Sequence, residues 1–376
     1  MSFAPPSYPP PPPPHHRWRR PWLVVALVAL VAWIAGLAGA IVGTKIASNQ
    51  SAPARTPSTL GLVEAEPRTE PLPPMDVLAA ASVVGPSIVS VDVISEVSEG
   101  LLRGSGTGIV LTADGEILTN AHVIEGAETV SVRLPGETEP RRATVLASDV
   151  GRDLALLRID ADGLQPATFA AAGDIRVGDP VLAVGFALAL DGDPSVTQGI
   201  VSALDRTSAD DLRALKGLIQ TDTPISSGNS GGPLVNSLGQ VVGVVTFVAT
   251  GEKGSQANDL GFAISNQELM PTIDRLRAQV TGETPVAGFL GVQLEPRLDG
   301  GSGALVAEVV TDSGADAAGI RVGDVVVAVD GVEITGQAGL VATIRDLEPG
   351  DEVEIELVRD GEARTVTAVL GVRPAD

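Results

Sequence analysis

The sequence predicts a mainly β protein in three parts: one transmembrane helix, an all-β barrel or sandwich domain, and a small α/β domain. Three observations support this prediction. An uncharged apolar segment lies near the N-terminus, many short β-rich runs separated by Gly, Asp and Pro fill the middle, and strands alternate with helix-like runs near the C-terminus. Long amphipathic helices, which a mainly helical fold requires, are almost absent.

The N-terminal region predicts a membrane anchor. Residues 1–20 form a Pro-rich tail, which is extended chain rather than helix or sheet. Residues 21–44 carry no charge, and their 22-residue core is long enough to cross about 30 Å of hydrocarbon as one helix. A cleaved signal peptide has a shorter apolar region, of about 7–15 residues. Because Arg17, Arg19 and Arg20 precede the span, the positive-inside rule predicts a cytoplasmic tail and extracytoplasmic domains.

The rest of the chain divides into a linker and two domains. Residues 45–74 are rich in Ser, Pro, Thr and Ala without an apolar period, so we expect a flexible linker with a reach of roughly 30 Å. The β-rich domain, 75–282, begins with a short helix and a strand and ends with a helix over 266–279. The α/β domain, 286–376, contains a helix over 340–347.

The composition excludes several classes of function. The formal charge is −22; residues 1–63 carry five bases and no acid, so the remainder has 20 bases against 47 acids, or −27. Such an acidic body repels polyphosphate, so no nucleic-acid binding is expected. Cysteine is absent, and His122 is the single histidine outside the Pro-rich tail. We therefore expect no thiol chemistry, no zinc site built on histidines and no cofactor.

Three short motifs point to nucleophilic catalysis. GNSGGPLVN, over 228–236, places glycines on both sides of Ser230, which allows a tight turn, an exposed hydroxyl and converging N–H groups. ILTNAHVI places His122 near a strand end, and RDLALLRI places Asp153 at the start of an apolar strand. Asp149 is interpreted as a turn residue. The order His, Asp, Ser, with gaps of 31 and 77 residues, is that of chymotrypsin-type β-barrel proteases.

These motifs carry a resemblance to a known family. SGTGIVLTADGEILTNAHVIEGAETVSVRL, SDVGRDLALLRID and TDTPISSGNSGGPLVN resemble the HtrA (DegP/DegS) family of serine proteases, from about Met75 to Val280. GFLGV and AGIRVGDVVVAVDGVEI resemble the single PDZ domain that follows the protease in such chains. The resemblance implies a chymotrypsin-like double β-barrel over 75–282 and a PDZ domain over 286–376. The plan is most similar to that of the membrane-tethered DegS-type members.

The resemblance also implies roles for individual residues. His122 is then the general base, Asp153 orients it, and Ser230 is the nucleophile. The implied oxyanion hole consists of Gly228, Asn229 and Ser230, and the implied substrate pocket of Ile225, Val245, Thr246 and Phe247. Pro224 stands where trypsin-like enzymes carry an aspartate and Asp222 comes too early to replace it, so cleavage after small or medium aliphatic residues is expected.

Partners and regulation follow from the same resemblance. The PDZ domain is expected to bind the carboxylate of C-terminal peptides at Phe289, Leu290, Gly291 and Val292. Unfolded, membrane or exported proteins are the implied substrates, and a homotrimer is the implied assembly. GFALALDGDPSVTQG, over 185–199, departs from the family pattern, so the sequence does not specify the resting state of this loop. The alternative function is a proteolytically silent PDZ scaffold or chaperone.

Overall fold

The computed structural model describes residues 62–97, 100–187, 192–209, 213–249, 260–283 and 286–373. All of these belong to one unit, Pro57–Asp376. The predicted tail, the predicted span and most of the predicted linker lie outside the described residues. Within the part of the chain that the structure describes, no helix is long and apolar enough to cross a membrane.

A first six-stranded barrel follows a short helix. The helix α2 (Val77–Val84) begins at Asp76, whose carboxylate accepts the Ala79 N–H at 3.0 Å. The barrel closes in the order β2-β3-β4-β7-β6-β5. Its strands are β2 (Ile88–Val97), β3 (Gly100–Val110), β4 (Glu116–Thr119), β5 (Thr129–Arg133), β6 (Arg141–Asp149) and β7 (Leu154–Arg158). The predicted helix-then-strand start of this domain is confirmed.

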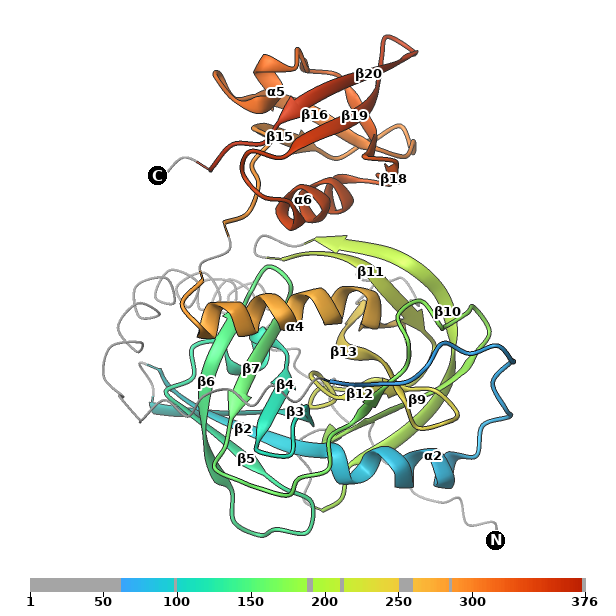
Figure 1. The fold of residues 1–376 in the computed structure, drawn as a ribbon, viewed down its shortest axis with the longest axis vertical. Coiled ribbons are helices and arrows are strands. Elements are labelled where there is room, and N and C mark those ends of the chain that lie inside the picture. Colours follow the sequence, from blue (N-terminus) through green and yellow to red (C-terminus); the bar gives the residue numbers. More distant parts are fainter. Residues whose placement is uncertain are drawn as a thin grey trace, which may run out of the picture. The chain divides into compact units, whose positions relative to one another are not determined.

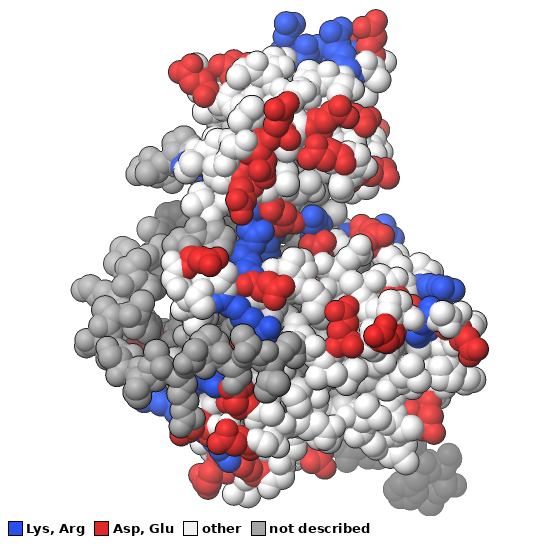
Figure 2. Space-filling view, viewed as in Figure 1, with Lys and Arg blue, Asp and Glu red and all other residues white. Residues whose placement is uncertain are grey.

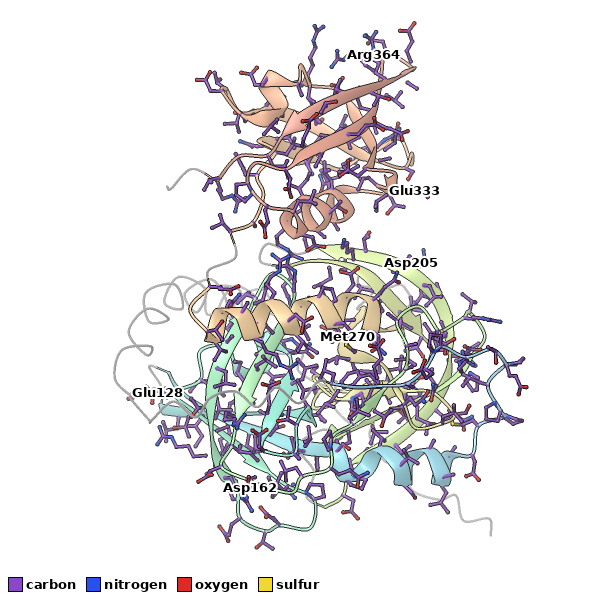
Figure 3. All side chains as sticks on the ribbon, viewed as in Figure 1. Glu128, Asp162, Asp205, Met270, Glu333 and Arg364 are labelled. Carbon is purple, nitrogen blue, oxygen red and sulfur yellow. The ribbon has the colours of Figure 1, made fainter. Side chains whose placement is uncertain are left out.

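A second ring of six strands follows, in the order β9-β10-β11-β14-β13-β12, and β12 pairs again with β9. Its strands are β9 (Pro180–Gly185), β10 (Ser195–Ala209), β11 (Ala214–Thr221), β12 (Pro233–Val235), β13 (Val241–Ala249) and β14 (Leu260–Ser265). The predicted closing helix is α4 (Asn266–Val280). Met270 of α4 packs against an apolar cluster that contains Leu118 of the first barrel and Val244 of the second (Figure 3). The two barrels and α4 therefore share one core, as expected of a chymotrypsin-like double barrel.

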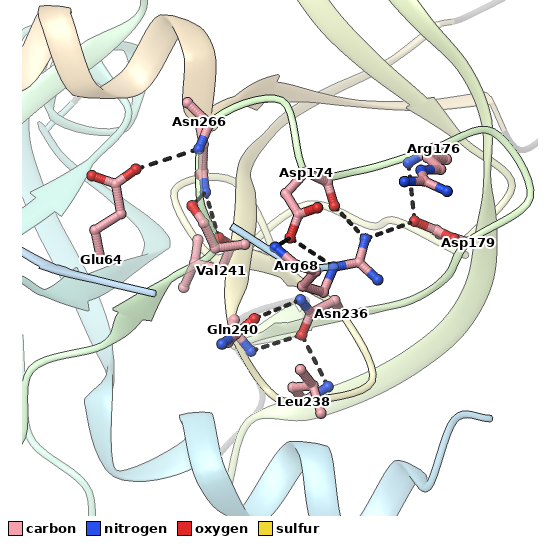
Figure 4. A network of polar contacts seen from close by, with 12 residues as sticks. Glu64, Arg68, Asp174, Arg176, Asp179, Asn236, Leu238, Gln240, Val241 and Asn266 are labelled. Carbon is pink, nitrogen blue, oxygen red and sulfur yellow. Dashed lines mark hydrogen bonds and ion pairs between the residues drawn. The ribbon is translucent and has the colours of Figure 1, made fainter. Parts of the chain in front are cut away.

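The last residues of the predicted linker pack on the second barrel. Val63–Glu64 forms β1, which pairs in parallel with β8 (Thr168–Phe169). Arg68 donates to the Asp174 carboxylate at 2.7 Å, and its guanidinium lies 3.6 Å from the Asp179 carboxylate (Figure 4). A two-residue strand has no apolar period that a sequence pattern can reveal, and this is why the composition alone indicated only a linker here.

The α/β domain is a sheet in the order β15-β16-β17-β19-β20, and β18 also pairs with β17. Figure 1 draws this domain in orange and red, with α6 at one side of the labelled strands. Its strands are β15 (Val292–Glu295), β16 (Ala304–Val309), β17 (Val325–Val329), β18 (Val332–Glu333), β19 (Glu352–Arg359) and β20 (Glu362–Val369). The helices are α5 (Gly314–Ala317) and α6 (Gln337–Asp346), so the predicted helix begins and ends slightly earlier than expected. Buried and exposed residues alternate along β19, because one face covers the core.

Two hairpins of this sheet turn on two residues each. Asp330 and Gly331 join β17 to β18, and Asp360 and Gly361 join β19 to β20. All four residues have positive φ, of 47°, 77°, 52° and 81°. Positive φ at both central residues is the requirement of a type I′ turn, whose twist matches that of the strands it joins.

Ion pairs join the end of α6 to both barrels, through Arg152 in the β6–β7 turn of the first and Lys216 on β11 of the second. The Asp346 carboxylate lies 2.6 Å from Arg152 and 2.7 Å from Lys216. Burial alone would raise the pKa of Asp346, but the hydrogen bond and charge of Lys216 and the charge of Arg152 outweigh burial and lower it. Elsewhere, acidic side chains are scattered over the face drawn in Figure 2 with basic ones between them.

Candidate active site

His122 and Asp153 come from two neighbouring turns of the first barrel. His122 lies in the short helix α3 (Ala121–Ile124), directly after β4, and Asp153 directly precedes β7. His122 Nδ1 is 2.9 Å from both carboxylate oxygens of Asp153. Asp153 has φ +55°, and the Asn120 amide donates to its carbonyl at 2.7 Å. Aspartate tolerates this left-handed conformation better than most residues, so the turn can aim its carboxylate inward.

Two further donors hold the Asp153 carboxylate, which is completely buried. The His122 backbone N–H donates to Oδ1 at 3.1 Å, and the Thr246 hydroxyl donates to Oδ2 at 2.5 Å. These two donors fix the position of the carboxylate against His122. The family resemblance predicted that Thr246 lines the substrate pocket. In the structure, its hydroxyl donates to the Asp153 carboxylate. A pattern could not reveal this, because the two residues are 93 positions apart.

Ser230 lies in a loop of the second barrel between Asn229 and Gly231. Gly231 has φ +82°, and a Cβ there would collide with the Thr107 carbonyl. The Ser230 hydroxyl donates to the Thr246 carbonyl at 3.1 Å. Among the described residues, no hydrogen bond joins this hydroxyl to His122. Asp153 and Ser230 thus both bond to Thr246, Asp153 to its hydroxyl and Ser230 to its carbonyl, while His122 bonds to Asp153.

Backbone N–H groups near Ser230 are available for an oxyanion. Gly228 has φ +97°, and its carbonyl accepts the Thr107 hydroxyl at 2.6 Å. The N–H groups of Gly228 and Ser230 have no acceptor among the described residues. The Asn229 N–H, in contrast, donates to the Ser226 carbonyl at 3.1 Å. Of the three predicted members, two therefore have an N–H free to bind a ligand.

Three of the four predicted pocket residues, Ile225, Val245 and Phe247, take part in apolar packing of the second barrel. Ile225 packs against the cluster that contains buried Val245. Phe247 stacks on Phe262 with ring centroids 4.9 Å apart. Asp222 accepts the Ile200 N–H at 2.7 Å, so its carboxylate is engaged with β10. These contacts are compatible with an apolar pocket that lacks a charge for a basic side chain.

The predicted PDZ carboxylate site has a similar pattern of free N–H groups. Gly291 has φ +87°, and a Cβ there would collide with the Ser313 side chain. Phe289 donates its N–H to the Gly371 carbonyl at 2.9 Å, whereas the N–H groups of Leu290 and Gly291 have no acceptor among the described residues. Val292 begins β15, and Leu290 belongs to one apolar cluster with Leu340 and Ile344 of α6.

Comparisons with known proteins agree with this architecture. The family model for the trypsin-like peptidase domain matches residues 106–244, and that for the PDZ domain matches residues 288–370. A probable periplasmic serine endoprotease, DegP-like, from Halomonas elongata is 37% identical over 281 residues, which are 72% of this chain and 57% of that protein. Its counterpart from Pseudomonas savastanoi is 37% identical over 72% of this chain and 56% of that protein. The chain thus spans somewhat over half the length of these relatives.

Solved structures of serine proteases are also similar to this chain. The HtrA-type protease AlgW with a tripeptide superposes with a TM-score of 0.64 at 29% identity, covering 80% of this chain and 98% of that one. The serine endoprotease from Yersinia pestis gives a TM-score of 0.58 at 29% identity, covering 80% of this chain and all of the other. Together with the paired His122 and Asp153 and the serine loop, these matches show that the chain belongs to the HtrA family of serine proteases, with one trypsin-like domain and one PDZ domain.

Proposed function

We propose that the chain is a membrane-anchored, extracytoplasmic, ATP-independent serine endopeptidase. The observation that carries the proposal is the buried Asp153 carboxylate, which is bonded both to His122 and to the Thr246 hydroxyl, while the Thr246 carbonyl holds the Ser230 hydroxyl. A bonded His–Asp pair beside a serine on a glycine-rich loop is the arrangement of acyl-transfer enzymes.

The proposed reaction begins with a rotation of the Ser230 side chain. The hydroxyl leaves the Thr246 carbonyl and donates to the imidazole of His122, which then accepts its proton as Ser230 attacks the scissile carbonyl. Asp153 stabilises the imidazolium that forms. The N–H groups of Gly228 and Ser230 bind the oxyanion, and the imidazolium then protonates the leaving amine. Hydrolysis of the acyl-enzyme repeats these steps with water.

For specificity, we propose cleavage after small or medium aliphatic residues. The support is the apolar packing of Ile225, Val245 and Phe247 and the engagement of Asp222 by β10. Peptides that differ only in the residue before the cut would test this. Val or Ala there should be cleaved well, whereas Lys or Arg should not.

For the PDZ domain, we propose that it binds C-terminal peptides at Phe289–Val292. The free N–H groups of Leu290 and Gly291 would receive the carboxylate, and the peptide would add as a strand beside β15. Hydrogen bonds to a charged group are each worth roughly 1.5–3 kcal/mol, so amidation of the peptide should weaken binding at least tenfold. Calorimetry on the full chain carrying Ser230→Ala would measure this, and equal affinities of acid and amide would contradict the site.

We also propose that residues 21–44 form the membrane anchor. The proposed substrates are unfolded, membrane or exported proteins, which the protease would degrade in quality control outside the cytoplasm. The relatives from Halomonas elongata and Pseudomonas savastanoi are named as probable periplasmic endoproteases, which supports an extracytoplasmic location. A homotrimer is proposed from the family resemblance, and sedimentation of the detergent-solubilised chain would test it.

The competing function is a silent PDZ scaffold, and the observation that favours it is the Ser230 hydroxyl, which donates to the Thr246 carbonyl. A fluorophosphonate probe separates the two functions. Labelling of the wild type that disappears in Ser230→Ala supports the protease. Absence of labelling with and without C-terminal peptides supports the scaffold.

A further inference from the structure

A cation lies beside the buried Asp153 carboxylate, in addition to His122. Arg213 Nη1 is 3.7 Å from Asp153 Oδ2, the oxygen that also accepts the Thr246 hydroxyl. The Asp153 side chain is completely buried and that of Arg213 is 29% exposed. A charge pair in such surroundings is screened less by solvent than a pair on the surface.

The position of Arg213 is set by its neighbours in the chain. Arg213 directly precedes β11, and the next residue, Ala214, donates its N–H to the Gly151 carbonyl at 3.4 Å. Ala214 and Leu215 are both buried. The start of β11 is thus attached to the turn that carries Asp153.

The other charges on this turn have their own partners. Arg152 pairs with Asp149 and with Asp346, both at 2.6 Å. The ion pairs that the structure gives to Asp153 join it to His122 and to Arg213. His122 therefore shares its carboxylate with a permanent cation.

We propose that Arg213 is a positioning residue of the triad that acts through Asp153 and sets the pH range in which His122 works as a base. The guanidinium offsets part of the charge that stabilises the His122 imidazolium, and it also repels the imidazolium directly. Both effects favour the neutral imidazole. The enzyme then remains active at a lower pH than it would with Asp153 alone.

The experiment measures the rate of fluorophosphonate labelling of the detergent-solubilised full chain between pH 5 and pH 9. Arg213→Gln should move the midpoint of the acid limb upward by about half a unit to one unit, because the carboxylate then stabilises the imidazolium more strongly. Arg213→Lys should keep the midpoint close to that of the wild type. The matched control is Arg206→Gln on β10, whose guanidinium bonds to Gln220 and which should leave the midpoint unchanged.

The inference rests on the proposed function, so a second readout is independent of activity. NMR titration of the His122 imidazole in the same full-length variants should show the same upward shift in Arg213→Gln. If the wild type is not labelled at all, the proposed function fails and the NMR titration alone decides the inference. An unchanged midpoint in Arg213→Gln, or an equal loss of rate at every pH that Arg213→Lys does not restore, overturns it.

Discussion

Asp153 and Asp346 are two carboxylates that each accept from several donors, and they differ in one respect. The partners of Asp346 are an arginine and a lysine, Arg152 and Lys216. Asp153 is paired with an arginine and with His122, whose charge can change near neutral pH. The comparison teaches that similar ionic contacts differ in the kind of partner they hold, and the histidine partner is what links Asp153 to the proposed catalysis.

Asp153→Asn is the strongest test of the proposed role of Asp153 in catalysis. The amide keeps the left-handed turn, since asparagine also tolerates positive φ, but it stabilises the wrong imidazole tautomer. We expect kcat to fall by on the order of 10³–10⁴-fold while the fold is retained, which circular dichroism would verify. Asp162→Asn, at an exposed carboxylate, is the control and should retain full activity. Retention of activity in Asp153→Asn would remove Asp153 from the mechanism.

The pH dependence of activity and the pH dependence of stability should differ, because the first depends on the partner of Asp153 and the second on Asp346. A general base must be neutral to accept a proton, so kcat/KM should rise between about pH 6 and pH 7.5 and then level off. The pKa of Asp346 is lowered in the fold, so its contribution to stability is present above about pH 4, the unfolded value, and is lost as the pH falls through the folded value. Activity should therefore disappear at a pH where the fold is still intact, which circular dichroism on the assay samples would verify.

Thr246→Val removes one donor from Asp153 without changing the side-chain volume much. A buried acceptor that loses its donor costs about 1–3 kcal/mol, and kcat should fall roughly tenfold with KM nearly unchanged. Thr246→Ser keeps the hydroxyl and should recover most of the rate. Equal kinetics of the valine and serine variants would show that this hydroxyl does not matter to catalysis.

Asp346→Asn tests whether the ion pairs of Asp346 stabilise the fold. The variant loses the ion pairs to Arg152 and Lys216, and we expect a loss of about 1–2 kcal/mol in unfolding free energy at pH 7, since the carboxylate is 26% exposed. Urea unfolding at pH 7 and pH 3 should show the difference between variant and wild type shrinking at the lower pH. A difference that is constant with pH would mean that the charge of Asp346 is not its source.

The smallest effect is expected at Glu268, in the first turn of α4. Burial raises the pKa of this carboxyl, and it does so more strongly than the attraction of Lys216 lowers it. Glu268→Gln should therefore raise the unfolding temperature at pH 7 by about 1–3 °C, and this gain should vanish below about pH 4, where the carboxyl is protonated in both states. Scanning calorimetry at the two pH values would measure it.

Much of the fold could be predicted from the sequence because its signals are local. Short β-rich runs, the helix at 266–279 and the glycines around Ser230 each lie within a few residues of the feature that they specify. The meeting of His122 and Asp153 was also expected, from the motif order and the family resemblance.

The contacts that the sequence did not reveal connect distant parts of the chain. Thr246 reaches Asp153 across 93 positions, and Arg213 reaches it from the turn before β11. Arg68 bonds to Asp174 across 106 positions. The direction of the Ser230 hydroxyl is a choice of side-chain rotamer, and a sequence motif specifies the residue but not its rotamer.

The two Asp-Gly turns of the PDZ domain have a consequence for the order of folding. Each closes a hairpin between strands that are immediate neighbours in the chain, with φ already in the region that the turn needs. The chain entropy lost on closing such short loops is small, and sheets with local contacts fold faster than barrels whose strands pair across long separations. The β19–β20 hairpin can therefore form early, within microseconds, whereas closing the first barrel requires strands as distant as β2 and β5 to pair.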